Sequence, residues 1–334
     1  MPTKSKKIEH KPLSPNEVLF GSTQQPSLDL PCDHYAGNPR FAAKAIELQA
    51  TAHGRFDITL DLEDGAALGN HRALCDEYID ILRSPKNSYR RMGIRLGDLE
   101  KSDWKQHTRA LISGAGKELA YITLPKIKST KQIVAFHKFV REQSKKAKLK
   151  RIIPLRVLIE TPQALAEVNA IAALPQVISL DFGLMDYMSE WQGRIPSYCM
   201  KSPWQFSHPL LAHAKIQISS AAAYFGKSAS HNVCVDVANP EQAFRDALCA
   251  KNEFGFNRMW SIHPDQITAI IAAFTPSQSE LNEAALILQQ AQAVDWAPIQ
   301  HAGQLHDRAS YRIFWQKICQ AKMLGVDMTK TFSS

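Results

Sequence analysis

The segment Ile153–Asp186, IPLRVLIETPQALAEVNAIAALPQVISLDFGLMD, contains the pattern that decides the fold. Its first apolar run, Ile153–Ile159, predicts a buried strand. Thr161 and Pro162 predict the start of a helix, because Thr caps a helix N-terminus and Pro suits the first helical position. A second apolar run, Val177–Phe182, predicts the next strand. The segment therefore predicts two parallel strands joined by a right-handed helical crossover.

The same alternation of apolar strands and amphipathic helices recurs along the chain. Further strands are predicted at Ile58–Leu62, Met92–Leu96, Ala120–Leu124, Val233–Val237 and Met259–Ile262. One more strand is expected earlier, near either Val18–Phe20 or Leu28–Pro31. About eight such units over roughly 250 residues predict an α/β fold of the (β/α)8 barrel type, the TIM barrel. The alternative is an open doubly wound sheet, but no Gly-rich phosphate loop follows the first strands.

The chain is expected to divide into three parts. Residues 1–15 carry several Lys and Pro and no apolar run, which predicts a disordered basic tail. Residues 16–275 are assigned to the barrel. Residues 276–334 are predicted to form a C-terminal helical extension or lid, beginning with a capping box between Ser277 and Glu280.

The positive charge of the chain is concentrated in two segments. Among 334 residues, 40 Lys and Arg face 32 Asp and Glu, a formal net charge of +8. Residues 1–12 carry +3 and residues 138–151 carry +6, so the rest of the chain is close to neutral. The second segment is the polar end of a predicted helix and lacks interleaved aromatic residues, so no nucleic-acid partner is expected.

Cysteine usage and hydropathy indicate a reducing, aqueous environment. The six Cys residues are scattered, and none forms a CxxC pair or joins a His cluster. Free thiols of this kind are typical of cytoplasmic proteins. No apolar run approaches the roughly 20 residues that cross a bilayer, and residues 1–15 do not resemble a secretory signal. We therefore expect a cytoplasmic protein with no membrane partner.

Charged residues mark the ends of the second and third predicted strands, where the chemistry of a barrel lies. Asp61 and Glu63 share one face of their strand and Asp64 follows it. The alternative to a buried acidic group is an exposed acidic turn. Arg95 lies within an apolar strand, and a buried Arg requires a partner. That partner is either a ligand carboxylate or the acidic group itself, as a structural ion pair.

Two more carboxylates follow sequential strands. Glu160 ends one strand and Asp186 follows the next, so both are expected at the same mouth of the barrel. Two carboxylates with waters and substrate oxygens form a Mg²⁺ site. The alternative is that Glu160 merely favours the N-terminus of its own helix. Lys126 also closes a strand and is a candidate for binding substrate or phosphate. His263 is expected to start a helix, although a ligand or base role stays open.

These motifs together resemble the citrate lyase beta subunit family, which includes malyl-CoA and citramalyl-CoA lyases. The matching strings are LDLEDGA at 60–66, the strand with Arg95, LPKI at 124–127, LIET at 158–161, LDFGLMD at 180–186 and SIHPDQI at 261–267. The resemblance covers roughly residues 36–325 and rests on six motifs in order. It departs at the start, where the family's Arg-Ser-x-Leu strand is missing, and at Gly97, where the family has Asn.

The resemblance implies a set of site residues. Glu160 and Asp186 are the implied Mg²⁺ ligands, and Arg95 is the group that holds the oxo-acid carboxylate and stabilises an enolate. Glu63 and Asp64 are implied to fix the waters of the metal and Arg95. The remaining implied residues are Asp307, as the general acid/base presented to a neighbouring subunit, and Arg40 and Lys44, as contacts of the CoA phosphates.

The resemblance also implies the reaction and the assembly. We expect a Mg²⁺-dependent carbon–carbon lyase that cleaves or forms a 3-hydroxyacyl-CoA such as citryl-, malyl- or citramalyl-CoA. The alternative is a metal-dependent pyruvate-type aldolase that acts on free hydroxy-oxo acids without CoA. The expected partners are an acyl-CoA thioester or a small oxo acid, and other copies of the chain in a homotrimer or hexamer.

Overall fold

The computed structural model describes residues 15–21, 29–63, 71–101, 103–237 and 239–328, which form two compact units. The larger unit, Pro26–Phe274, contains a closed barrel in which β1 to β8 follow one another in order. All eight neighbouring pairs are parallel. The predicted (β/α)8 barrel is therefore confirmed. The strands are β1 (Cys32–Ala36), β2 (Asp57–Asp61), β3 (Met92–Arg95), β4 (Ile122–Leu124), β5 (Leu155–Ile159), β6 (Val177–Phe182), β7 (Ser228–His231) and β8 (Arg258–Ser261).

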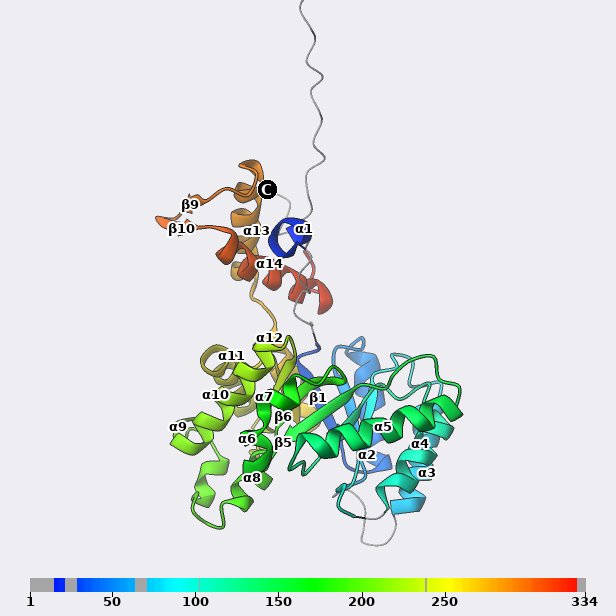
Figure 1. The fold of residues 1–334 in the computed structure, drawn as a ribbon. Coiled ribbons are helices and arrows are strands. Elements are labelled where there is room, and N and C mark those ends of the chain that lie inside the picture. Colours follow the sequence, from blue (N-terminus) through cyan, green and yellow to red (C-terminus); the bar gives the residue numbers. More distant parts are fainter. Residues whose placement is uncertain (1–14, 22–28, 64–70, 102, 238, 329–334) are drawn as a thin grey trace, which may run out of the picture. The chain divides into compact units, whose positions relative to one another are not determined.

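Helices surround the barrel and bury an apolar layer against its outer face (Figure 1). They are α2 (Pro39–Thr51), α3 (His71–Arg83), α4 (Trp104–Ala115), α5 (Thr130–Lys146), α6 (Pro162–Ala166), α7 (Val168–Ala172), α8 (Leu184–Glu190), η1 (Ser197–Met200), α9 (Trp204–Ser207), α10 (Pro209–Tyr224), α11 (Pro240–Phe254) and α12 (Pro264–Phe274). Thr161 caps α6 as predicted, since its hydroxyl accepts the amide hydrogen of Ala164 at 3.0 Å.

Two strands differ from the predictions for one physical reason. β1 begins directly after Pro31, so the first expected location was wrong and the second lay just before the strand, and β7 lies before the predicted run Val233–Val237. Both strands carry polar side chains that are buried inside the barrel, for example Asp33 and Ser230. Such strands do not form apolar runs, so periodicity does not find them. Val233 and Val235 instead lie beyond the strand end and line a cavity.

Ion pairs fill the amino-terminal half of the barrel. Arg156 binds Asp33 and also Asp57, the latter at 2.7 Å. Arg258 lies 3.0 Å from Asp57 and 3.5 Å from Asp33. The Arg156 guanidinium also stacks 3.4 Å from the ring centroid of Tyr121. Two arginines and two aspartates therefore neutralise one another where most barrels carry branched apolar side chains.

The smaller unit consists of segments from both ends of the chain. It contains α1 (Pro15–Phe20), α13 (Gln278–Ala293), the antiparallel pair β9 (Ile299–His301) and β10 (Gln304–His306), and α14 (Arg308–Met323). Its own core joins Leu19 to Leu281, Tyr311 and Ile318. The capping box between Ser277 and Glu280 forms as predicted. The assignment of residues 16–275 to the barrel was too long at its start, because α1 packs on α14 and is not a strand.

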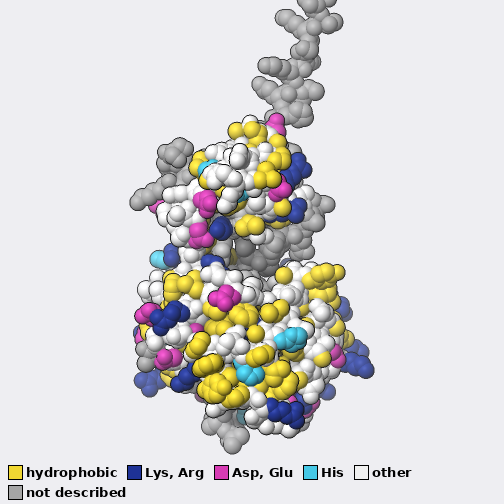
Figure 2. Space-filling view, turned by 90° about the vertical axis from the view of Figure 1, so that its left-hand side faces the viewer, with side chains coloured by type: hydrophobic (Ala, Val, Ile, Leu, Met, Phe, Trp, Pro, Cys, Tyr) yellow, Lys and Arg dark blue, Asp and Glu magenta, His cyan; other side chains and the backbone are white. Residues whose placement is uncertain are grey.

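The surface of the barrel unit carries exposed apolar side chains. Figure 2 shows apolar residues gathered on one face of this unit. Tyr198, Trp204, Ile216 and Tyr224, on η1, α9 and α10, are each more than half exposed. Exposed apolar surface of this kind is typical of protein contacts. No helix in the described ranges is long and apolar enough to cross a membrane.

Candidate active site

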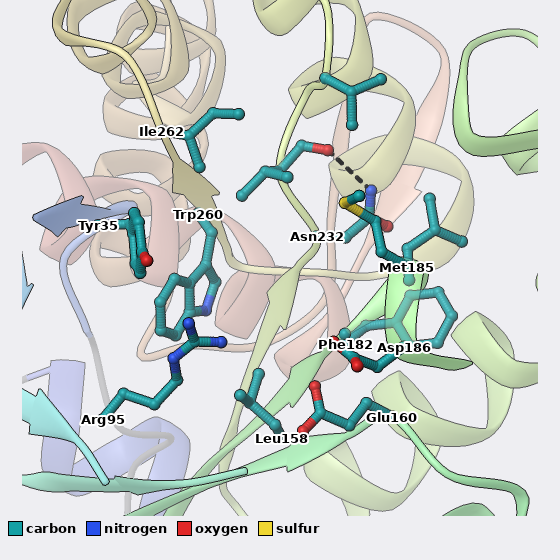
Figure 3. A pocket seen from close by; sticks show the side chains of 14 residues that line it. Tyr35, Arg95, Leu158, Glu160, Phe182, Met185, Asp186, Asn232, Trp260 and Ile262 are labelled. Atoms are coloured by element: carbon teal, nitrogen blue, oxygen red, sulfur yellow. Dashed lines mark hydrogen bonds between the residues drawn. The ribbon is translucent and has the colours of Figure 1, made fainter. Parts of the chain in front are cut away.

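A cavity of about 370 Å³ opens at the carboxyl-terminal ends of the strands (Figure 3). Residues from β1, β3, β5, β6 and β8 and from the segments that follow the strands line it. The polar lining residues are Tyr35, Arg95, Glu160, Asp186 and Asn232, and the apolar ones include Leu158, Phe182, Leu184, Met185, Val233, Val235, Trp260 and Ile262. The cavity is therefore polar on one part of its wall and apolar on the rest, at the barrel end that carries active sites.

Arg95 is held in place by two carboxylates. It ends β3, and its Nε donates to Asp61 Oδ1 at 2.7 Å, while one terminal nitrogen lies 2.8 Å from Glu63 Oε2. Asp61 also accepts from the Tyr35 hydroxyl at 2.8 Å. Asp61 is directly opposite Arg95 in the parallel register of β2 and β3. Carboxylates that support a guanidinium in this way orient it for a planar anion such as a ligand carboxylate.

Arg95 and Asp61 perturb each other's ionisation in the expected direction. Burial alone would raise the pKa of Asp61, but the charge and hydrogen bond of Arg95 hold it below its ordinary value. Burial opposes the charged form of Arg95, whereas Asp61 and Glu63 raise its pKa. Both groups therefore stay charged. The predicted ion pair between Arg95 and the acidic group exists, and Arg95 also faces the cavity, so the two interpretations of this residue are compatible.

Glu160 and Asp186 lie together on the other side of the cavity from Arg95 (Figure 3). Glu160 follows β5 and is buried, while the side chain of Asp186, in the first turn of α8, is 41% exposed. The Lys126 backbone amide donates to Glu160 Oε1 at 2.5 Å. Gly183 makes this packing possible, because a Cβ there would come within 2.4 Å of Glu160 Oε2. The two predicted metal ligands are thus adjacent.

The environment of Glu160 opposes its negative charge. Burial, followed by repulsion from Glu63 and Asp186, raises its pKa from 4.5 to about 8. Among the described residues around the cavity, the carboxyl groups of Asp61, Glu63, Glu160 and Asp186 lie beside two cations, Arg95 and Lys126. Among these described groups the net formal charge is −2, which one divalent cation would cancel.

The donor set fits Mg²⁺. Within the described part of the chain, no three His, Cys, Asp or Glu side chains are arranged to hold a metal by themselves. Two carboxylates beside an open cavity suit Mg²⁺, which keeps several waters and takes its remaining ligands from substrate. Glu160 and Asp186 are the residues that would hold it.

Not every predicted site residue lies at this cavity. Arg95, Glu63, Lys126, Glu160 and Asp186 come together there. Arg40 and Lys44 are exposed on α2, which starts at the same end of the barrel, and Lys44 lies 3.7 Å from Glu47. Asp307 is the exposed N-cap of α14 in the smaller unit. Asp64 lies outside the described residues. His263 precedes α12 and accepts the Asp265 amide hydrogen at 3.3 Å, as expected for a helix start.

Sequence reasoning missed several residues that shape the cavity. Trp260 lines it, and its indole N–H donates to buried Asp181 at 3.1 Å. Asn232 lines the wall and accepts from buried Lys215 at 2.7 Å. Lys215 also contacts His231 at 2.6 Å, and burial lowers the pKa of both. A buried Lys within the apolar pattern of α10 was the one sign available in the sequence.

Comparisons with known proteins agree with this geometry. A model of the HpcH/HpaI aldolase/citrate lyase family matches residues 41–264. An L-malyl-CoA/beta-methylmalyl-CoA lyase from Cereibacter sphaeroides is 24% identical over 334 residues, covering 94% of this chain and 97% of the relative. A solved citrate lyase structure from Burkholderia xenovorans LB400 is 41% identical, with 94% and 97% of the two chains covered and a TM-score of 0.87. Protein CitE from Mycobacterium tuberculosis, solved with magnesium and acetoacetate, is 25% identical, covers 74% of this chain and 91% of that one, and has a TM-score of 0.58.

Proposed function

The chain belongs to the HpcH/HpaI aldolase/citrate lyase family, and we propose on that basis that it is a Mg²⁺-dependent carbon–carbon lyase. Its substrate is a 3-hydroxyacyl-CoA such as malyl-, citramalyl- or citryl-CoA, which it cleaves or forms. The observation that carries the proposal is the pair of carboxyl groups, Glu160 and Asp186, that line the same cavity as Arg95. Relatives named as lyases of malyl-CoA support the substrate class.

In the proposed reaction Arg95 binds the substrate. Its guanidinium group faces the cavity and is oriented by ion pairs with Asp61 and Glu63, so a substrate anion would bind a donor that is already fixed in position. Cleavage leaves an electron pair on the thioester end as an enolate. A cation held in a partly dry cavity stabilises that developing charge without reorganising.

Glu160 and Asp186 hold Mg²⁺ in this proposal. When bound, the ion supplies Lewis acidity that acidifies the substrate hydroxyl and stabilises the oxo-acid product. Glu63 and Lys126 keep the surrounding charges in place, at 2.8 Å from each other. Asp64 is proposed to assist Glu63, as the family resemblance implies.

Asp307 is the proposed acid for the last step. Cleavage removes the hydroxyl proton and requires one proton at the enolate carbon, so it consumes none overall. Asp307 is exposed at the start of α14, and both of its backbone contacts, from Ala309 and Ser310, use Oδ1. We propose that it reaches the site of a neighbouring subunit in a homotrimer or a hexamer, since an exposed side chain can serve another copy.

The apolar wall of the cavity favours a thioester over a free acid. Leu158, Phe182 and Trp260 are buried in the cavity, while Met185 and Ile262 lie at more accessible positions. A free hydroxy-oxo acid has little apolar surface to cover these side chains, whereas an acyl chain and the CoA arm do. Arg40 and Lys44, at the same barrel end, are the proposed contacts of the CoA phosphates. The free thiols of all six Cys also support a cytoplasmic location.

Turnover of defined thioesters tests the proposal. Purified protein with Mg²⁺ is mixed with malyl-, citramalyl- and citryl-CoA, and the oxo acid is measured as its phenylhydrazone. We expect turnover of at least one thioester, its loss in Glu160→Ala, and its retention in Glu167→Ala, a control carboxylate at the end of α6 that binds Thr130 and does not line the cavity. Full turnover by Glu160→Ala, or none by the wild type, contradicts the proposal. Cleavage of free hydroxy-oxo acids alone would support the aldolase alternative.

A further inference from the structure

Lys126 contacts carboxylates that follow three different strands. Its Nζ lies 2.8 Å from Glu63 Oε1 and 4.0 Å from Asp186 Oδ1, and its backbone amide donates to Glu160 Oε1 at 2.5 Å. The residue adopts a left-handed φ of +51°, which an L side chain rarely takes. The segment after β4 therefore holds Lys126 in this position against its own backbone preference.

We infer that the Lys126 ammonium is a built-in counter-cation that competes with the divalent metal for Asp186 and thereby limits metal affinity. The inference rests on the proposed Mg²⁺ site at Glu160 and Asp186. It differs from a direct role of Lys126 in substrate binding, because the ammonium is directed to the acidic side chains of the site itself.

The two parts of Lys126 act separately. The backbone amide binds Glu160 Oε1 and leaves Oε2 beside Gly183 and the cavity. The side chain has its shorter contact with Glu63 and its longer one with Asp186. It is one-third exposed, so it can keep Glu63 and release Asp186 when a metal ion binds. A substitution of the side chain removes the competing charge and preserves the amide that orients Glu160.

The charge of the site predicts whether substitution of Lys126 strengthens or weakens metal binding. With every group ionised, the described groups carry a formal charge of −2 with Lys126 and −3 without its ammonium. A unit positive charge next to a divalent ion weakens binding by about tenfold even where solvent screens it as strongly as bulk water. Removing the ammonium should therefore tighten binding of a divalent cation by about tenfold.

Calorimetric titration of the metal-free, full-length protein with Mn²⁺ or Mg²⁺, without substrate, tests the inference. The variants are Lys126→Met and Lys126→Gln, and the matched control is Lys128→Met, whose ammonium lies 2.9 Å from Glu100. We expect the dissociation constant to fall about tenfold in both Lys126 variants and to stay within about twofold of the wild type in Lys128→Met. Thermal unfolding of each variant in EDTA shows whether it is folded.

The outcomes separate this inference from the proposed function. Unchanged or weaker metal binding by folded Lys126 variants overturns the competing role and leaves the metal site intact. Loss of wild-type binding in Glu160→Ala identifies the titrated site as the proposed one. No metal binding by the wild type removes the Mg²⁺ proposal itself, and the role of Lys126 with it.

Discussion

The two ends of the barrel use buried charge in opposite ways. At the amino-terminal end, Asp33 and Asp57 are matched by Arg156 and Arg258, and all four are buried. At the carboxyl-terminal end, four carboxylates face Arg95 and Lys126 beside a cavity. A balanced buried set depends on each of its members, because removing one leaves an uncompensated buried charge, whereas an unbalanced set lowers its own stability until a ligand binds. The difference separates the part of the barrel that stabilises the fold from the part that binds.

The largest expected effect comes from breaking the balanced end. Arg156→Met leaves Asp33 and Asp57 with less compensation in the barrel interior, so the free energy of unfolding should fall by about 3–5 kcal/mol. Urea unfolding followed by circular dichroism measures it. The fraction of Arg156→Met that stays folded should have the wild-type turnover per folded molecule. A loss below about 1 kcal/mol would show that the network contributes little to stability.

An arginine at the carboxyl-terminal end of the barrel should affect catalysis more than stability. Arg95→Lys keeps the positive charge for Asp61 and Glu63 but loses the planar fork that meets the substrate anion. We expect kcat/KM to fall about a hundredfold, which corresponds to about 2.7 kcal/mol of transition-state stabilisation, with the unfolding free energy within about 1 kcal/mol of the wild type. Steady-state kinetics and urea unfolding of one preparation measure both. A large loss of stability with normal kcat/KM would assign Arg95 to structure alone.

The unbalanced end should also make stability depend on pH. Folding raises the pKa of Glu160 from 4.5 to about 8, because the site is buried and Glu63 and Asp186 repel its charge. The metal-free folded protein then retains a proton that the unfolded chain releases, so the contribution of Glu160 is complete below pH 4.5 and is lost as pH rises to about 8. Between these limits the unfolding free energy should drop by about 5 kcal/mol more in the wild type than in Glu160→Gln.

Urea unfolding at several pH values in EDTA measures this difference, and Glu160→Gln serves as the reference because it cannot ionise. Saturating Mg²⁺ should remove the drop near pH 8, since a ligand that binds only the folded state stabilises it. Identical slopes for the two proteins in EDTA would contradict the assigned environment of Glu160.

The same contrast explains what the sequence could reveal. β6 was predicted with its correct bounds and β5 nearly so, because both are apolar and a readable helix start follows β5. Arg95, Glu160 and Asp186 were found because they interrupt or end apolar runs. β1 and β7 were misplaced because their buried side chains, such as Asp33 and Ser230, are polar. The side-chain partner Thr59 of Asp33 and the strand partner Arg258 of Ser230 are each more than 20 residues away in sequence, so no local pattern reveals that the strands are buried.

Many cavity residues could not be predicted from the sequence, because their contacts join distant parts of the chain. Trp260 and Asp181 are 79 residues apart, and Lys215 and Asn232 come from a helix and the end of another strand. Apart from Lys215, which interrupts the apolar pattern of α10, each of these residues alone is typical of an ordinary core or surface position. The family motifs, in contrast, identified most of the charged residues of the cavity, because these lie at strand ends in a fixed order.

The smallest expected effect is a change in KM on removal of exposed positive charges on the helices around the barrel. Arg40 and Lys44 are exposed on α2, whose start follows β1 at the cavity end, whereas Lys146 is in the last turn of α5 at the opposite end. If the first two contact CoA phosphates, Arg40→Ala and Lys44→Ala should each raise KM for the thioester about three- to tenfold and leave kcat unchanged. Lys146→Ala removes the same charge from the protein as a whole and should leave KM unchanged.

Kinetics at two salt concentrations separate a local contact from general attraction, because general attraction would affect all three variants alike and weaken with salt. Equal KM values for Arg40→Ala, Lys44→Ala and the wild type would place the CoA phosphates elsewhere on the barrel rim.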